Sequence, residues 1–530
     1  MFAVFPLPAA HGDATAFADA VNSLVKGKFK DKERAVSAIE ASGDERSLAV
    51  LKALLAGDLY YRKSDRQVVY REKTDKGYHL TGVLSNEDLG VVKRRAAKKI
   101  GINNKLRGVL RGAIARLSLT HPDPARRLAA AREMLGSVDA ASAPLLRDAL
   151  AREGDGAIAG MLKLGLALVD SHSPDAATRL GAIAVLGESL EPAARNRLQA
   201  LLQPAPDGAF AEPDARVRKA AARALSRIQE RLEFYEFLET VFFGLSLGSV
   251  LLLAAIGLAI TFGVMGVINM AHGELIMLGA YTTYVVQLMM PDHIEYSLWV
   301  AIPAAFLVAG LVGVLIERGV IRFLYGRPLE TLLATFGISL ILQQLVRTIF
   351  SPLNRSVATP EWLSGSWAIN SALSLTYNRL YIIIFALLVF ALLFLILKRT
   401  RLGLYVRAVS QNRAMAKAVG VRSEWVDALT FGLGSGIAGV AGVALSQLTN
   451  VGPNLGQAYI IDSFMVVVFG GVGNLWGTLV GAMSLGVANK FLEPWAGAVL
   501  AKILILVLII LFIQKRPRGL FPQQGRAVES

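Results

Sequence analysis

The second half of the chain consists of long apolar stretches with almost no ionisable residues. The segment 242–268 carries no charge, and similar charge-free runs follow at 275–291, 296–316, 331–346, 380–397, 428–461 and 463–489. Roughly twenty consecutive apolar residues cross the hydrocarbon core of a bilayer as a helix. We therefore expect an all-α, polytopic membrane domain of about eight spans, some of them broken by glycine or re-entrant.

The first half has a different composition. Up to Glu239 it holds 37 Lys and Arg and 30 Asp and Glu, whereas the remaining 291 residues hold 19 and 11. The net charge of +15 does not indicate nucleic acid, because the basic residues of the membrane half cluster in short loops, where they report topology. We expect no nucleic-acid partner. The absence of cysteine excludes thiolate metal sites, and no histidine spacing indicates a metal.

A soluble helical domain is predicted for residues 19–236. Apolar residues recur there at spacings of three and four, and Arg126–Leu150 and Ala176–Leu202 each have the pattern of two short helices around a turn. Such units stack into HEAT-like repeats. The exception is Asp58–Thr81, whose alternating pattern predicts a small β-hairpin.

The predicted domain limits follow from these patterns. Residues 1–18 resemble the remnant of a signal peptide, with small residues suited to cleavage. The soluble domain is expected at 19–236, the membrane domain at 237–522 and a cytoplasmic tail at 523–530.

Basic residues indicate the orientation of the spans. The loop 398–422 contains seven Lys and Arg without an acid, and three more basic residues follow the last span at 515–518. Both segments should be cytoplasmic. Counting backward along the spans places the soluble domain on the opposite, periplasmic side and the C-terminus in the cytoplasm.

Two polar segments interrupt the apolar runs and are candidates for a substrate path. In the first, Asn269, His272, Gly273 and Glu274 follow a glycine-rich stretch, and a helix is expected to begin near His272. The alternative is ordinary helix-start chemistry, with Asn269 as a cap and Glu274 as an acid at the cytoplasmic interface.

The second polar segment lies between residues 458 and 494. Both ends must lie outside if the last span ends in the cytoplasm, so the chain between them must leave and return. We expect a re-entrant or broken hairpin that bends at its glycines. The candidate path residues here are Gly471, Gly473, Asn474 and Thr478, and the expected bends are at Gly470, Gly471, Gly473, Gly477 and Gly481.

The basic loop contains an amphipathic helix at 403–420, ending at a glycine. Such a helix could dock into a cytoplasmic partner, and a membrane-surface helix held by anionic lipid fits the pattern nearly as well. No G-x-x-x-x-G-K-[ST] motif occurs, so we expect no cofactor and no ATP site in this chain.

Three motifs resemble one known family in order and sequence: residues 266–274 (GVINMAHGE), 407–412 (RAVSQN) and 469–478 (FGGVGNLWGT). They resemble the branched-chain amino acid and urea permeases (LivH-like) of ATP-binding-cassette (ABC) importers, over roughly 237–522. The long N-terminal domain and the stretch 332–364 look most like the urea permease subunits of the UrtB type.

This resemblance implies a heteromeric importer of the bacterial inner membrane. Its parts would be this subunit, a second permease subunit, two cytoplasmic ATPase subunits that use the ATP, and a periplasmic substrate-binding protein. It also implies a coupling helix that contacts an ATPase. The residues that would carry the coupling are Arg407, Ala408, Gln411, Asn412 and Ala416.

Other functions remain open from sequence. A branched-chain amino acid permease is the nearest alternative, and its zwitterionic cargo would favour charged partners near the path. A passive channel for small neutral solutes would need no coupling helix. A membrane-anchored scaffold would not need so many glycine-broken spans. An enzyme is not expected, because no nucleophile, base and orienting group occur at a recognisable spacing.

Overall fold

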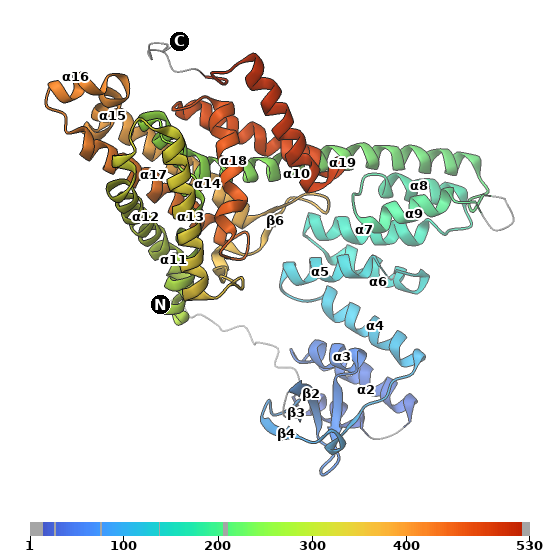
Figure 1. Ribbon diagram of the computed structural model, residues 1–530. Helices are drawn as coiled ribbons and strands as arrows, with labels where there is room; N and C mark the ends of the chain where they lie inside the picture. The colour runs from blue at the N-terminus through green and yellow to red at the C-terminus, as the bar shows by residue number, and fades with distance from the viewer. Residues whose placement is uncertain (1–13, 26–27, 75–76, 137, 205–209, 522–530) are drawn as a thin grey trace, which may run out of the picture. The chain divides into compact units, whose positions relative to one another are not determined.

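Two compact units make up the computed structural model, Met1–Arg231 and Leu232–Ser530 (Figure 1). The expected tail at 523–530 and most of the expected signal remnant lie outside the described residues. α1 begins at Ala14, and Phe17, which falls within the expected remnant, is fully buried in the core of the first unit. The residues described are 14–25, 28–74, 77–136, 138–204 and 210–521.

The first unit begins with three helices and an antiparallel sheet. In the described part of the chain the sheet has five strands in the order β4-β3-β2-β1-β5, and β2 pairs with β3 so that Tyr70 lies opposite Thr81. The predicted hairpin is thus confirmed as the centre of a larger sheet. These elements are α1 (Ala14–Ser23), α2 (Phe29–Ala41), α3 (Ser47–Ala56), β1 (Leu59–Arg62), β2 (Val68–Thr74), β3 (Gly77–Gly82), β4 (Asp88–Val92) and β5 (Ala97–Lys99).

Paired helices follow the sheet and form the predicted repeat-like stack (Figure 1). The two-helix units expected from sequence are α5 with α6 and α8 with α9. Their apolar faces are buried between neighbouring helices, as period-3.6 patterning requires. The helices are α4 (Asn104–Leu119), α5 (Pro124–Met134), α6 (Ala143–Arg152), α7 (Gly156–Asp170), α8 (Ala176–Leu186) and α9 (Pro192–Leu202).

A Pro-Asp-x-x-x-Arg turn recurs at the start of helices in this stack. At α8, Asp175 caps the helix, and Arg179 Nη1 donates to the carbonyls of Ser173 and Pro174, both at 2.9 Å. Nη2 of Arg179 also pairs with Glu212 at 2.8 Å. The arginine therefore folds back and satisfies two backbone carbonyls of the turn that precedes the helix. Related turns contain Asp123 with Arg127 and Asp214 with Arg218.

α10 (Ala215–Met265) contributes residues to both units. Its first turns bury Ala221, Ala224 and Ile228 on one face of the helix. Its later turns are uncharged and lie in the core of the second unit.

The second unit is a bundle of apolar helices. Among the described residues, six helices are long and apolar enough to cross a membrane, and two shorter apolar helices, α11 and α18, accompany them. The prediction of an all-α, polytopic membrane fold is confirmed. Its elements after α10 are α11 (His272–Met289), α12 (Ile294–Gly319), α13 (Pro328–Phe350), β6 (Ser366–Ala368), β7 (Ser374–Thr376), α14 (Tyr377–Arg399), α15 (Arg401–Gln411), α16 (Arg413–Ala418), α17 (Ser423–Ser446), α18 (Leu455–Gly470) and α19 (Leu475–Lys515).

α17 is almost wholly buried and packs against α11 and α12. A Cβ added to Gly439 would lie 2.4 Å from the Ala305 carbonyl oxygen, and one added to Gly442 would lie 2.0 Å from that of Ile276. The glycines of α17 therefore allow the backbones of neighbouring helices to approach closely. The short helices α15 and α16 lie together at one end of the unit (Figure 1).

Candidate functional site

The chain between α10 and α11 is folded around Asn269. Asn269 Oδ1 accepts a hydrogen bond from Ala271 N at 3.0 Å, and Met270 N donates to Thr335 Oγ1 of α13 at 3.1 Å. α11 then begins at His272, as predicted. Asn269 therefore holds the turn that precedes α11, but the residue at the cap position is Ala271, so the capping role that the sequence allowed for Asn269 is not observed.

His272 is fully buried, and its Nε2 lies 2.8 Å from the Ala254 carbonyl oxygen of α10. A carbonyl only accepts, so Nε2 carries the proton and donates it. Nδ1 of a neutral ring is then an acceptor. This hydrogen bond joins the first turn of α11 to α10.

Glu274 is 1% exposed and turns toward α13. Its Oε1 accepts hydrogen bonds from Gln343 Nε2 at 2.7 Å and from Ser339 Oγ at 3.0 Å. An ordinary helix-start acid at an interface would be solvated, so that alternative does not fit Glu274. The carboxyl instead links α11 to α13 within the apolar bundle.

We call Asn269, His272, Glu274, Ser339 and Gln343 the polar cluster. Within the described residues, Asn269 Nδ2, His272 Nδ1 and Glu274 Oε2 are buried without a hydrogen-bond partner. Each such atom costs about 1–3 kcal/mol. Polar groups retained at that cost inside a membrane bundle are typical of a functional site.

Gly273 serves close helix packing. A Cβ on Gly273 would lie 2.5 Å from the carbonyl oxygen of Gly456, and a Cβ on Gly456 would lie 2.2 Å from that of Gly273. Only glycine at both positions lets α11 and α18 approach this closely. Gly273 thus brings the start of α11, with the polar cluster, against α18.

α18 and α19 are joined by a tight turn at the predicted glycines. Gly471 and Gly473 have φ values of 106° and 78°, which favour glycine. Asn474 Oδ1 accepts from Gly477 N at 3.1 Å and caps α19. Thr478 is buried, and its hydroxyl donates to the Asn474 carbonyl at 3.0 Å. The expected bends at Gly471 and Gly473 are confirmed.

The expected bends at Gly477 and Gly481 are wrong. Both residues lie inside α19, where a Cβ on Gly477 would be 2.1 Å from the Gly470 carbonyl oxygen of α18. The segment is a hairpin of two packed helices, and these glycines allow the close contact. Glycine at a helix contact and glycine at a bend look alike in sequence, and the prediction did not separate them.

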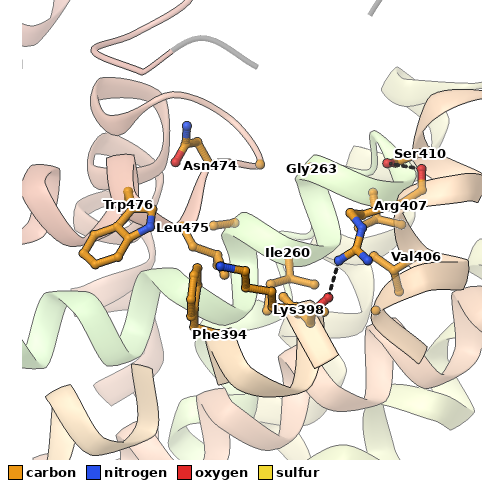
Figure 2. Close-up of a pocket in the computed structure, with 15 residues that line it drawn as sticks. Ile260, Gly263, Phe394, Lys398, Val406, Arg407, Ser410, Asn474, Leu475 and Trp476 are labelled. Atoms are coloured by element: carbon orange, nitrogen blue, oxygen red, sulfur yellow. Dashed lines mark hydrogen bonds between the residues drawn. The ribbon is translucent and has the colours of Figure 1, made fainter. Parts of the chain in front are cut away.

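A cavity of about 360 Å³ lies where this turn meets the basic loop (Figure 2). Asn474 and Trp476 lie on one side of it, Arg407 and Ser410 on the other, and Lys398 reaches in between them. We call it the first cavity. It brings together Gly473 and Asn474 from the predicted path and Arg407 from the predicted coupling helix. The residues of the polar cluster, together with Thr478 and Gly471, are not in its lining.

The predicted coupling residues differ in exposure. Gln411 and Asn412 are exposed, and Asn412 Oδ1 caps α16 by accepting from Met415 N at 2.9 Å. Arg407 donates to the Leu397 carbonyl of α14. Ala416, in contrast, is 3% exposed. Its side chain therefore does not present a docking surface.

Ala416 packs in a small apolar cluster that holds α15 and α16 on the bundle. Ala408 is half-buried beside it. The other members of the cluster core are Val406, Val409 and Val426.

Arg413 and Asp427 form an ion pair that holds α16 against α17, and this pairing was not predicted from the sequence. Arg413 donates to both carboxylate oxygens of Asp427, at 2.8 and 2.7 Å, and stacks on the Tyr325 ring at 3.8 Å. The sequence feature that could have indicated it is Asp427, an acidic residue directly beside the charge-free run 428–461.

Ser339 and Gln343 were also missed, although two hydrogen-bonding side chains four residues apart in the apolar run 331–346 share one helix face.

Comparison with known proteins identifies the family. Residues 240–513 match the family described as "Branched-chain amino acid transport system / permease component". The chain belongs to this family. It is a multi-pass inner-membrane permease component, as the apolar helices of its second unit require.

Curated relatives cover little more than half of the chain. The LivH permease protein of Salmonella typhimurium is 31% identical over 299 residues, which is 54% of this chain and 96% of the relative. BraD of Pseudomonas aeruginosa is 32% identical over 298 residues, again 54% and 96%. Both are named as permease proteins of high-affinity branched-chain amino acid transport systems.

The likeness extends to a permease named for another cargo. The ribose import permease protein RbsC of Escherichia coli is 27% identical over 255 residues, 46% of this chain and 75% of the relative. Sequence similarity at this level therefore reports a permease architecture more reliably than a solute. No solved structure matches the chain.

Proposed function

We propose that this chain is a permease subunit of an ABC importer for urea. One observation carries the choice within the family. The alignment spans 96% of LivH but only 54% of this chain, so nearly half of the chain, including most of the helical-repeat unit, has no counterpart in that amino acid permease. A long N-terminal domain is the feature by which the chain resembles the urea branch.

The chemistry of the path is compatible with urea. Urea offers one carbonyl acceptor and four N–H donors and carries no charge, so neutral hydrogen-bonding groups are sufficient to bind it. Asn269, Gln343 and Ser339 supply these groups at the start of α11, and Asn474 supplies an amide at the first cavity. Gly273, Gly471 and Gly473 bring backbone close to these side chains.

We assign the coupling role to the α15–α16 segment, at the cytoplasmic end of the bundle. Gln411 and Asn412 are exposed there for contact with an ATPase subunit, and Arg407 connects the segment to the first cavity and to α14. Ala408 and Ala416 pack the segment against the bundle. The partners in this proposal are a second permease subunit, two ATPase subunits and a periplasmic binding protein, with the repeat unit in the periplasm.

A branched-chain amino acid importer is the second candidate. The observation that favours it is the printed function of LivH and BraD, the relatives at 31% and 32% identity. The same subunit composition and the same coupling segment would serve this cargo.

The test is ATP-dependent uptake of labelled urea and labelled leucine by vesicles that contain the complete importer. Uptake of urea alone is expected. Uptake of leucine alone would replace urea by the second candidate, and uptake of either solute without ATP would replace the importer by a channel.

Coupling is tested in the same vesicles. Arg407→Ala and Asn412→Ala should keep ATP hydrolysis and lose most solute uptake, because they alter the segment between cavity and ATPase. Arg401→Gln, an exposed cation on the same helix, is the matched control and should transport normally. Normal uptake by Arg407→Ala and Asn412→Ala would refute the coupling assignment.

A further inference from the structure

A second cavity lies in the membrane unit, away from the site described above. It measures about 220 Å³ and lies between α10, α18 and α19. It shares no lining residue with the first cavity. Unusually for a space among apolar helices, much of its lining is polar. The polar side chains are Tyr459, Asp462, Asn489, Lys490, Glu493 and Lys502.

Two ion pairs lie in this lining. Lys502 Nζ donates to Asp462 Oδ2 at 2.9 Å, and Lys490 Nζ donates to Glu493 Oε2 at 2.6 Å. The Asp462 side chain is 12% exposed and that of Lys502 is 50% exposed. Ion pairs of this kind add little net stability, since desolvation offsets their attraction. Charges among membrane helices instead mark solute pathways.

The cavity also lies at a break in α19. Gly497 has φ 76° and ψ 162°, which are not helical values, and Pro494 precedes it. Glu493 lies before the break, Ala498 and Lys502 lie after it, and all three line the cavity. A broken helix leaves backbone N–H and C=O groups unpaired at its ends, and transporters use such ends to bind solutes in the membrane.

We infer that the second cavity is a solute-binding station on the transport route, selective for a small molecule that carries a hydrogen-bond acceptor beside N–H donors. The Lys502 ammonium would donate to the acceptor oxygen, and the Asp462 carboxylate would accept from the N–H groups. Tyr459 and Asn489 supply further hydrogen bonds. The inference rests on the proposed function, because it takes the cargo to be such a solute.

This chemistry is shared by urea and by the head group of an α-amino acid. Urea presents one carbonyl oxygen between two amino groups, whereas an amino acid presents a carboxylate beside an ammonium. The apolar remainder of the lining, which includes Leu247, Met465 and Leu485, could also accept an aliphatic side chain. The two solutes are therefore separate arms of one experiment.

Binding is measured without the periplasmic binding protein, since that protein would otherwise set the apparent affinity. The permease–ATPase complex in lipid nanodiscs is titrated with labelled urea and, separately, with labelled leucine. Asp462→Asn and Lys502→Gln should each weaken binding of the transported solute about ten- to a hundredfold, because each removes a hydrogen bond to a charged group. Lys515→Gln, on the same helix but outside the cavity, is the control and should bind as the parent does.

The double variant Asp462→Lys with Lys502→Asp distinguishes an ion pair that only stabilises the fold from one that binds the solute. It keeps the pair but exchanges donor and acceptor relative to Tyr459 and Asn489. Thermal stability should recover in this variant while binding stays weak. If binding recovers with stability, or if the single variants bind normally, the station is refuted. Should Asp462→Asn fail to assemble, Asp462→Glu keeps the charge while enlarging the side chain, and it must weaken binding as well.

Failure of this inference differs from failure of the proposed function. A parent complex that imports a solute in vesicles but binds neither solute here would refute the station and leave the importer standing. A complete importer that takes up neither urea nor leucine would refute the proposed function itself.

Discussion

Arg413 and Asp427 form a two-armed ion pair, with N–O distances of 2.8 and 2.7 Å, between the start of α16 and the first turns of α17. The Asp427 side chain is 5% exposed, so little solvent competes for it. Two parallel hydrogen bonds fix the orientation of the guanidinium relative to the carboxylate as well as the distance between them. The exposed residues Gln411 and Asn412 therefore lie at the junction of α15 and α16, which this ion pair holds against the buried helix α17.

Asp427→Asn should loosen this junction, because an amide cannot accept both guanidinium hydrogen bonds. A lost hydrogen bond to a charged group costs about 1.5–3 kcal/mol, so ATP-driven uptake should fall roughly tenfold or more. The measurement is the ratio of uptake to ATP hydrolysis. Glu424→Gln, an exposed acid one turn earlier, serves as the control. An unchanged ratio in Asp427→Asn would contradict the anchoring role.

Glu274 is expected to act as a hydrogen-bond acceptor. In Glu274→Gln the amide oxygen can still accept from Ser339 and Gln343, so uptake should stay within a few-fold of the parent. Glu274→Leu leaves both donors buried without an acceptor, at about 1–3 kcal/mol each, and should abolish uptake. Equal loss in both variants would show that the charge itself is required.

The contact between Gly273 and Gly456 should tolerate no methyl group. Gly273→Ala places its Cβ 2.5 Å from a backbone oxygen, so α11 and α18 must separate. We expect a loss of about 1–3 kcal/mol, seen as a lower unfolding temperature in detergent. Gly337→Ala is the matched control, because a Cβ there meets nothing within 4 Å. If both variants unfold at the same temperature as the parent, the packing argument is wrong.

Acid should weaken the helical-repeat unit through Glu153. Its hydrogen bonds with Arg127 hold the pKa of this carboxyl below its ordinary value. A carboxyl with a lowered folded-state pKa stabilises the fold above its unfolded pKa of about 4, and this contribution is lost as pH falls through the folded pKa. Glu153→Gln should therefore destabilise α5 and α6 at pH 7, and the difference from the parent should shrink as the pH falls below about 4.

Hydrogen–deuterium exchange of α5 and α6 peptides, corrected for the intrinsic pH dependence of exchange, measures this effect. Glu188→Gln changes an exposed carboxylate elsewhere in the same unit and controls for net charge. A difference between Glu153→Gln and the parent that persists unchanged near pH 3 would contradict the assignment.

Much of the fold was predicted from the spacing of apolar residues, because a helix that buries one face repeats apolar residues every three or four positions. The pairs α5–α6 and α8–α9, the start of α11 at His272 and the turn at Gly471 were all expected. The sheet beyond β2 and β3 was not expected, since β1, β4 and β5 are only three to five residues long and two of the three residues of β5 are lysines. A strand whose residues alternate between apolar and polar can be recognised in the sequence, whereas a short edge strand that forms only by pairing with its neighbour cannot.

The site was harder to predict, because its residues meet only in three dimensions. Glu274 was singled out, but its partner Gln343 lies 69 positions away. Lys502 is the one charged residue of 495–513, yet its partner Asp462 lies 40 positions before it. A polar residue within an apolar run can be recognised in the sequence, whereas its partner depends on which helices pack against each other in the fold.

The glycine contacts of α18 fix how it lies between two neighbouring helices. Gly456 meets Gly273 of α11 and Gly470 meets Gly477 of α19, so at both places backbone lies directly against backbone. Because a Cβ at any of these glycines would lie within 2.5 Å of a facing backbone atom, a shift of one residue along the helix would bring a side chain into that space. The contacts therefore set the register of α18, and with it the depth of Asp462 in the bundle.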